Sequence, residues 1–352
     1  MRILLTADNV GGVWTYALDL ARGLRAAGDD VVLATMGRPL RADQRADAEA
    51  AQLLALHESD FALEWMADPW DDVDAAGAWL LEIAHGQAID VVHSNTFAHG
   101  ALDWGRPVVV AGHSCVVSWW RAVEGADPPA EWAEYRRRVR VGLDAADAVV
   151  APTRWMLRQL ESAYGVRHGL TIANGSSAAE SAVDKQPFVL AAGRLWDRAK
   201  GLDLLDRAAA RLPWPVLAAG DAGATAHVQA LGRLSRHELA ALRERASVFV
   251  APARYEPFGL GVLEAARTGC ALVLAEIPSL RELWSGAATF VDALDSDALH
   301  AALARLLSDH DERARLGRAA QMRARRYTVA RMTRAYRHLY ARVAAARAEV
   351  PA

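Results

Sequence analysis

Two glutamates, Glu256 and Glu264, enclose the glycine-containing segment 257–263. We expect this segment to form a turn that leads directly into a helix over residues 265–268. The first backbone N–H groups of a helix have no intrahelical partner, and the positive end of the helix dipole attracts phosphate. The two carboxylates can accept hydrogen bonds from hydroxyl groups. The spacing therefore predicts a site for a ligand that combines a phosphate with a polyol.

A second group of candidate residues lies in a loop bounded by Gly193 and Gly201, after an apolar run at 188–192. Arg194 offers a planar fork for phosphate oxygens, and Lys200 offers a compact positive charge. Such cations stabilise the negative charge that builds on a departing phosphate. Arg198 in the same loop is an alternative to Lys200, and lysine and arginine are usually solvated surface residues. We favour phosphate binding by Arg194 and Lys200.

In the N-terminal half, Gly11-Gly12 follows an apolar strand and precedes a helical pattern. These residues lack side chains, so a donor phosphate or an acceptor hydroxyl can approach the backbone closely. The segment does not complete G-x-G-x-x-G, so a dinucleotide site is poorly supported. His113 ends another strand, at 108–112. It could contact a ligand, relay a proton near neutral pH or serve only the structure.

Other polar and aromatic residues are candidates for contacts with a second substrate. Asp8 and Asn9 follow the first strand, and His93, Ser94 and Asn95 close a neighbouring one. Aromatic rings combine apolar area with a polar edge, so Trp119 and Trp120 could stack on a sugar, cover a lipid tail or belong to the core. The acceptor candidates are Asn9, Asn95, Trp119 and Trp120.

Short apolar runs that alternate with helical patterns position these residues. The predicted strands are 2–7, 30–34, 88–93, 108–113 and 148–151, then 188–192, 215–219, 226–231, 248–251, 271–275 and 289–291. Helices are expected at 14–27, ending near Gly28, and at 327–345. The alternation predicts two doubly wound α/β domains with ligands at the carboxyl ends of their strands. The boundary is expected within 175–186, where Asn174-Gly175 suits a turn with positive φ.

The composition limits the possible functions. The chain has 352 residues, too many for one ordinary core, and is 53% hydrophobic and 24% charged, which is typical of globular proteins. The net charge of −3 argues against a nucleic-acid partner. Cys115 and Cys270 stand far apart in apolar surroundings, so we expect no disulfide framework and a reducing compartment.

The N-terminus shows no signal-peptide pattern, and no apolar run approaches the roughly 20 residues that span a bilayer. We therefore expect a cytoplasmic protein, with peripheral contact at the inner face of a membrane as the alternative. Asp295 and Asp297 make an unconvincing metal site, and the arginines at 136–140 are typical of a solvated helix face.

Five motifs in the same order resemble those of retaining glycosyltransferases of the GT-B fold, family 4 (glycosyltransferase group 1). Glu256 and Glu264 resemble the Glu-x7-Glu motif of this family, and the loop from Gly193-Arg194 to Lys200-Gly201 resembles its donor-phosphate loop. The remaining matches are the Gly-Gly loop at 9–13, the interdomain signature at 173–175 and the strands at 231–234 and 249–252. Together these matches run through nearly the whole chain.

The resemblance implies two Rossmann-like domains that face each other across a cleft. Residues 1–175 would bind the acceptor and residues 176–328 the nucleotide-sugar donor. The final helix, 329–352, would cross back onto the N-terminal domain.

The resemblance also implies roles for individual residues. Glu256 would hydrogen-bond the donor sugar near its transferred carbon, and Glu264 would hold the ribose hydroxyls. Lys200 is preferred to Arg198 because a glycine follows it, as in the family pattern. His113 would contact the transferred sugar through its 6-hydroxyl. Backbone groups around Leu234 would meet the base, and the backbone amides of Phe258, Gly259 and Leu260 would bind the phosphates.

The implied reaction is transfer of a hexose from a nucleoside-diphosphate sugar to a glycan or lipid-linked acceptor, with retention at the transferred carbon through front-face substitution. Arg194, Lys200 and a helix terminus can do the work of a divalent ion, so we expect neither a metal nor a cofactor. UDP-glucose is the favoured donor because it is frequent in the family. Two alternatives remain, a nucleotide-sugar epimerase of GT-B architecture and a non-catalytic nucleotide-sugar-binding protein. The sequence does not specify the donor base, the acceptor or the oligomeric state.

Overall fold

The computed structural model describes residues 1–180 and 183–348. The chain forms two compact units. Unit 1 consists of Met1–Gly175 and the C-terminal segment from Val329, and unit 2 consists of Ser176–Thr328. The expected boundary segment 175–186 includes residues 181 and 182, and the expected final segment includes residues 349–352, all of which lie outside the described residues.

Unit 1 is built on a parallel sheet with the strand order β3-β2-β1-β4-β5-β6-β7. Its strands are β1 Arg2–Asp8, β2 Asp30–Met36, β3 Ala55–Glu58, β4 Val91–Ser94, β5 Val108–Ala111, β6 Ala148–Ala151 and β7 Gly169–Thr171. The order 3-2-1-4-5-6 is that of a Rossmann domain, here extended by β7. The predicted strands are confirmed within a few residues, whereas β3 and β7 were not predicted.

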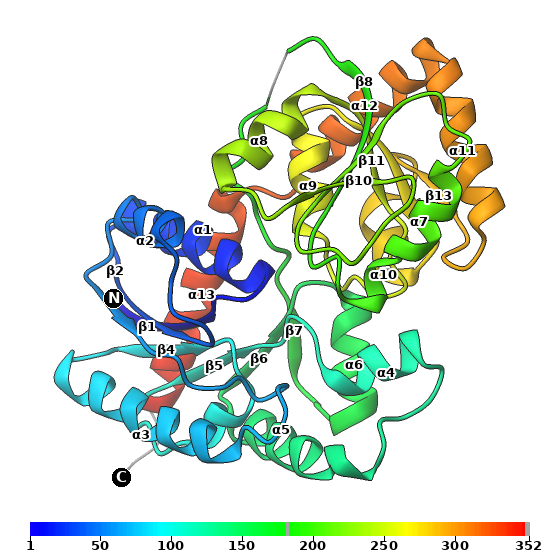
Figure 1. Cartoon of the computed structure of the whole chain (residues 1–352). Coiled ribbons are helices and arrows are strands. Elements are labelled where there is room, and N and C mark those ends of the chain that lie inside the picture. The colour runs from blue at the N-terminus through cyan, green and yellow to red at the C-terminus, as the bar shows by residue number, and fades with distance from the viewer. Residues whose placement is uncertain (181–182, 349–352) are drawn as a thin grey trace. The chain divides into compact units, whose positions relative to one another are not determined.

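Helices cover this sheet. They are α1 Gly12–Ala26, α2 Ala42–Glu49, α3 Trp70–Gly86, α4 Val116–Val123, α5 Ala133–Ala145, α6 Arg154–Tyr164 and α13 Val329–Ala348, with the 3-10 turns η1 Ala98–Ala101 and η2 Ala130–Trp132. The predicted return of the final helix to the N-terminal domain is confirmed, because α13 contacts α1 and buries Tyr336 and Tyr340. Figure 1 shows α13 in red beside α1 in blue.

Unit 2 repeats the design with the strand order β10-β9-β8-β11-β12-β13, again entirely parallel. Its strands are β8 Gln186–Ala192, β9 Val216–Ala219, β10 Gln229–Gly232, β11 Ala246–Ala251, β12 Ala271–Ala275 and β13 Thr289–Val291. Its helices are η3 Arg198–Lys200, α7 Leu202–Ala209, α8 Arg236–Arg245, α9 Leu260–Arg267, α10 Pro278–Trp284, α11 Ser296–Ser308 and α12 His310–Ala324. The chain thus folds into two Rossmann-like domains, as expected.

Several local features bear on the sequence predictions. Every residue of β12 is buried, as expected for a parallel strand covered on both faces. Cys115 in unit 1 and Cys270 in unit 2 are both buried, and neither forms a disulfide. The turn predicted at Asn174-Gly175 is wrong, because neither residue is among the described positions with positive φ. In the described part of the chain, no helix is long and apolar enough to span a bilayer.

Close packing of α5 on η1 gives a test of the fold of unit 1. A Cβ at Gly142 in α5 would lie 1.9 Å from the backbone oxygen of Phe97, which a side-chain rotation cannot relieve. We expect Gly142→Ala to lower the free energy of unfolding by about 1–3 kcal/mol because the helix must shift. Urea denaturation of the purified protein measures the change.

Gly86, the last residue of α3, is the matched control because a Cβ there meets nothing. Gly86→Ala should leave stability unchanged or raise it by up to about 1 kcal/mol. Equal effects of the two substitutions would contradict the packing described for α5 and η1.

Candidate active site

The loop from Gly193 to Gly201 in unit 2 leaves the carboxyl end of β8 and closes with the turn η3. Asp197 caps this turn by accepting a hydrogen bond from the Ala199 backbone N–H at 2.9 Å. Gly201 follows with φ at +67°, and a Cβ on it would lie 2.4 Å from the backbone oxygen of Pro252. Glycine is therefore required here, because it lets the loop pass directly beside the end of β11.

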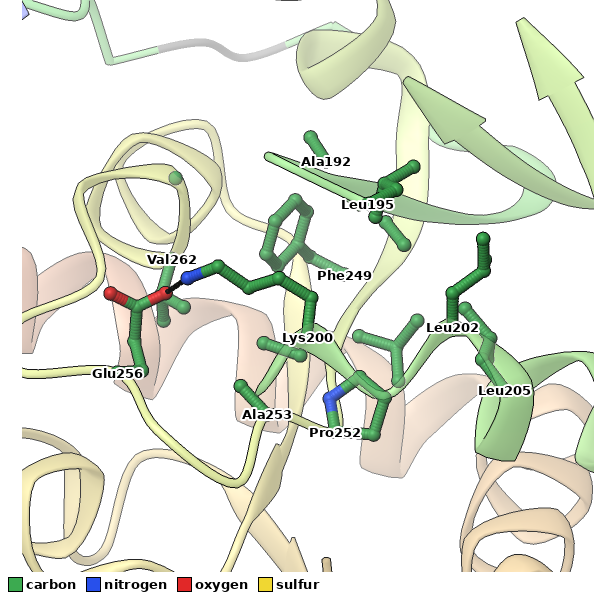
Figure 2. A pocket seen from close by; sticks show the side chains of 14 residues that line it. Ala192, Leu195, Lys200, Leu202, Leu205, Phe249, Pro252, Ala253, Glu256 and Val262 are labelled. Carbon is green, nitrogen blue, oxygen red and sulfur yellow. Dashed lines mark hydrogen bonds and ion pairs between the residues drawn. The ribbon is translucent and has the colours of Figure 1, made fainter. Parts of the chain in front are cut away.

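This close approach brings Lys200 and Glu256 into contact. The Lys200 Nζ donates to Glu256 Oε2 at 2.8 Å, and the two side chains are 17% and 21% exposed. They line a pocket of about 40 Å³ whose floor includes Phe249 and Gly261. Figure 2 shows the Lys200 side chain extended toward Glu256. Arg198, the alternative cation, is exposed.

The helix after Glu256 is α9, which begins at Leu260 rather than at residue 265, so the predicted bounds were wrong. The reason is Gly259, which occupies the N-cap position with φ at +83°, a conformation open to glycine and costly for other residues. The N–H groups of the first turn lack intrahelical partners, so this terminus suits an anion. Glu264 consequently lies in the second turn and is not a first-turn acid.

Glu264 forms a buried ion pair with Arg243 of α8, which the sequence analysis missed. The two residues are 7% and 4% exposed, and the Arg243 Nη1 donates to Glu264 Oε2. The Arg243 backbone oxygen also accepts from the side chains of Thr268 and Cys270. Arg243 is one of several arginines in a polar helix, so the sequence carried no signal for this contact.

Arg194 points toward its own loop. Its guanidinium lies 3.5 Å from Asp197 and 5.8 Å from the ring centroid of the exposed Trp196. The structure thus joins Lys200 to Glu256 directly, while Arg194 and Glu264 each have another partner. Leu234 is partly buried between β10 and α8, next to the capping residue Ser235. The ligand roles of these residues remain predictions.

In unit 1, His113 follows β5 and is partly buried. Its Nε2 lies 2.8 Å from Asn95 Oδ1, and its ring centroid lies 4.3 Å from that of Tyr16. Removal from water lowers the pKa of His113 to about 4, so the ring is neutral at pH 7.

His93 and Ser94 are fully buried, so their interpretation as candidates for contacts with a second substrate was wrong. The His93 Nδ1 lies 2.5 Å from the Tyr340 hydroxyl, and its Nε2 lies 3.3 Å from the Tyr16 hydroxyl. Burial lowers the pKa of His93 to about 3, so it too is neutral at pH 7. The histidine thus ties α13 and α1 to the centre of the sheet.

The loop after β1 uses its polar side chains internally. Asp8 Oδ1 accepts from the backbone N–H groups of Val10 and Gly11 at 3.0 and 3.2 Å. The Asn9 side chain is buried and bonds both the backbone N–H and the backbone oxygen of Arg38. Gly11 is extended and Gly12 opens α1. These contacts fix the loop, and ligand contacts by Asn9, Gly11 and Gly12 remain predictions.

Trp119 and Trp120 lie in α4 and are both partly buried, with ring centroids 6.0 Å apart. Partial burial fits all three interpretations of these rings, which are stacking on a sugar, covering a lipid tail and packing in the core, so their role at the acceptor also remains a prediction. Asp295 caps α11 by accepting from two backbone N–H groups. Over residues 1–180 and 183–348, no cluster of three or more histidine, cysteine or acidic residues could hold a metal ion.

A buried carboxyl group that the sequence analysis missed lies beside the segment that follows β4. Glu64, 7% exposed, accepts from the backbone N–H groups of Phe97 and Ala98 at 3.0 and 2.9 Å. Burial raises the pKa of Glu64 to about 7, and the nearby charge of Asp8 adds to this. The only available signal was a single acid flanked by Leu63 and Trp65.

Residues 10–175 match the family described as Glycosyltransferase Family 4, and residues 176–323 match the family described as Glycosyl transferases group 1. The chain belongs to these glycosyltransferases. This confirms the resemblance in the sequence and identifies the protein as a glycosyltransferase enzyme.

Among curated proteins, the alpha-maltose-1-phosphate synthase of Mycolicibacterium smegmatis is 28% identical over 298 residues, which cover 68% of this chain and 76% of the relative. Two solved structures share the fold. Sucrose-phosphate synthase from Thermosynechococcus elongatus aligns with a TM-score of 0.78 at 20% identity, over 98% of this chain and 100% of the other. Anabaena HepE in complex with UDP-glucose aligns with a TM-score of 0.74 at 18% identity, over 99% and 100%. Both alignments support the GT-B fold.

The buried Arg243–Glu264 pair gives a stability prediction for this glycosyltransferase. Arg243→Ala leaves a buried carboxylate without its partner, so we expect the free energy of unfolding to fall by about 3–5 kcal/mol. Chemical denaturation measures this loss. Arg245→Ala, on the exposed face of the same helix, is the control and should change stability by less than about 0.5 kcal/mol. Similar losses in both variants would refute the ion pair.

Glu64 gives a prediction for pH dependence. Its pKa is 4.5 as a model value and about 7 in the folded protein, so between these values the folded state holds a proton that the unfolded chain has released. Stability should therefore fall as pH rises from about 4.5 to about 7, by an amount on the order of 3 kcal/mol, and then level off.

The measurement is the unfolding free energy of the wild type minus that of Glu64→Gln, which cannot ionise, at several pH values. A difference that stays constant or grows with pH would show that Glu64 is not held in its neutral form.

Proposed function

We propose that this glycosyltransferase moves a hexose from a nucleoside-diphosphate sugar to a sugar-containing or lipid-linked acceptor, with retention at the transferred carbon. The observation that carries the proposal is the contact of Lys200 with Glu256 between β8, β11 and the N-terminus of α9. A cation, an anion-binding helix terminus and a carboxylate stand there within one pocket. This combination suits a ligand whose phosphate and sugar hydroxyls are joined.

We also propose that the Lys200–Glu256 ion pair rearranges when the donor binds. The two opposite charges lie 2.8 Å apart in the structure. A diphosphate carries more negative charge than one carboxylate and competes for the ammonium group. Once Lys200 turns to the phosphate, the oxygens of Glu256 become available to the hydroxyls of the donor sugar.

In the reaction we propose, the bond between the anomeric carbon and the β-phosphate oxygen breaks while the acceptor oxygen bonds to the same face of that carbon. The acceptor proton passes to the departing phosphate oxygen, so the step needs no protein nucleophile. Lys200, Arg194 and the first turn of α9 stabilise the growing phosphate charge. Because these groups supply positive charge, we propose that the transfer is metal-independent.

The identity of the substrates is also a proposal. Anabaena HepE has been solved in complex with UDP-glucose, and the mycobacterial relative is named as a synthase of a sugar phosphate. We therefore favour a UDP-hexose as the donor. Glu264 would hold the ribose, with one oxygen fixed by Arg243.

Lys200 and Glu256 can be separated experimentally. Lys200→Ala removes a charge-assisted contact worth about 1.5–3 kcal/mol, so nucleoside-diphosphate affinity should fall by roughly tenfold to a hundredfold. Glu256→Ala should retain nucleotide binding and lose turnover by at least about a hundredfold. Binding is measured by thermal shift with UDP-, GDP- and ADP-sugars, since ligand at 100 times Kd stabilises by about 2.7 kcal/mol. Turnover is followed by release of the nucleoside diphosphate.

Arg198→Ala, in the same loop but exposed, is the control and should bind like the wild type. Full turnover in Glu256→Ala would refute the role of that carboxylate. A converted sugar nucleotide with no transfer product would favour the epimerase, and binding without any turnover would favour a non-catalytic protein.

A further inference from the structure

We propose that Asn95 is a positioning residue that fixes the tautomer of His113, with the proton on Nε2 and a lone pair on Nδ1. The use of that lone pair by a ligand rests on the proposed function, whereas the tautomer itself does not. The inference starts from the three-residue chain of contacts from Thr6 through Asn95 to His113.

The orientation of the Asn95 amide follows from chemistry. One end of the amide lies 2.5 Å from the backbone oxygen of Thr6, which can only accept, so the amide nitrogen must face it. The Asn95 backbone N–H also donates to the Thr6 hydroxyl at 2.8 Å, which holds the residue on β1. The amide oxygen is then the atom that faces His113 Nε2 at 2.8 Å.

A carboxamide oxygen accepts and cannot donate, so His113 Nε2 must carry the proton. The groups that face His113 from the packed elements add no charge. Tyr16 of α1 presents its ring, and burial raises its pKa well above 10. His93 of β4 is neutral at pH 7, and the pKa of His113 itself is lowered to about 4. The imidazole is therefore neutral, with its second nitrogen unprotonated.

Within the described residues, no recorded hydrogen bond engages Nδ1 of the partly buried His113. A neutral acceptor nitrogen at the end of a central strand recognises an O–H group. The substrate class that fits it is a sugar with a free hydroxyl at this point. An imidazolium or the opposite tautomer would present an N–H there instead, which the hydroxyl could meet only as an acceptor.

The tautomer can be measured without any substrate. Histidine labelled with nitrogen-15 gives distinct NMR signals for protonated and bare ring nitrogens, and His113→Gln assigns the His113 signals. We expect a neutral ring at pH 7 with the proton on Nε2, and a mixture of tautomers in Asn95→Ala. A proton on Nδ1, or an imidazolium at pH 7, in the wild type would overturn the proposal.

The pH profile of kcat/KM tests the positioning role of Asn95, because a residue that only supports the fold would not shift the profile along the pH axis. Asn95→Asp can still accept from Nε2–H but loses the donor to the Thr6 backbone oxygen, and in its ionised form its negative charge favours the imidazolium and raises the pKa of His113. The acidic limb of the profile should move up by at least about one pH unit, because an interaction worth 1.36 kcal/mol shifts a pKa by one unit. Activity lost in Asn95→Asp at mildly acidic pH should return as the pH rises.

The matched control is Gln44→Glu, the same amide-to-acid change at a buried side chain of α2 that bonds the backbone of Asn9 and not His113. Its acidic limb should stay in place. If Asn95→Asp only lowers kcat/KM evenly at all pH values, Asn95 supports the fold and does not set the state of His113. If neither the wild type nor any variant shows turnover, the proposed function fails. The NMR measurement still decides the tautomer of His113 in that case.

Discussion

Both domains depend on one constraint, the reversal of strand order around a central parallel strand. In unit 1 the chain departs from β1 toward β2 on one side and later returns to β4 on the other, and unit 2 treats β8, β9 and β11 in the same way. The loops that follow two adjacent strands therefore run apart, and the carboxyl edge between them stays open. Thr6 and Asn95 meet at one such point, and Lys200 and Glu256 meet at the other.

Much of the fold could be predicted because parallel strands covered on both faces are apolar along their whole length. The β12 segment is fully buried, and its apolar run at 271–275 predicted the strand with the correct bounds. The strands β3 and β7 were missed because each lies at a sheet edge and is only partly buried, so its sequence need not be apolar. The start of α9 was misplaced because Gly259 and Gly261 looked like parts of one turn, although Gly259 alone ends it.

The candidate site was only partly accessible from the sequence. The family motifs predicted that Lys200 and Glu256 contact a common ligand. The contact between the two side chains could not be predicted, because it depends on the close approach of Gly201 to Pro252. The partner of Glu264 could not be found, because burial of a single arginine on a polar helix is a tertiary property. The same holds for Asn95, whose importance depends on which backbone oxygen its amide meets.

The position of α13 has a consequence for synthesis on the ribosome. Residues from Val329 onward complete unit 1, and Tyr340 reaches the centre of its sheet through His93. Unit 1 therefore contains residues that are translated before unit 2 and residues that are translated after it. The sheet of unit 1 can bury Tyr340 only after that residue has been translated, whereas the whole sequence of unit 2 is available earlier. Unit 1 is thus begun before unit 2 and completed after it.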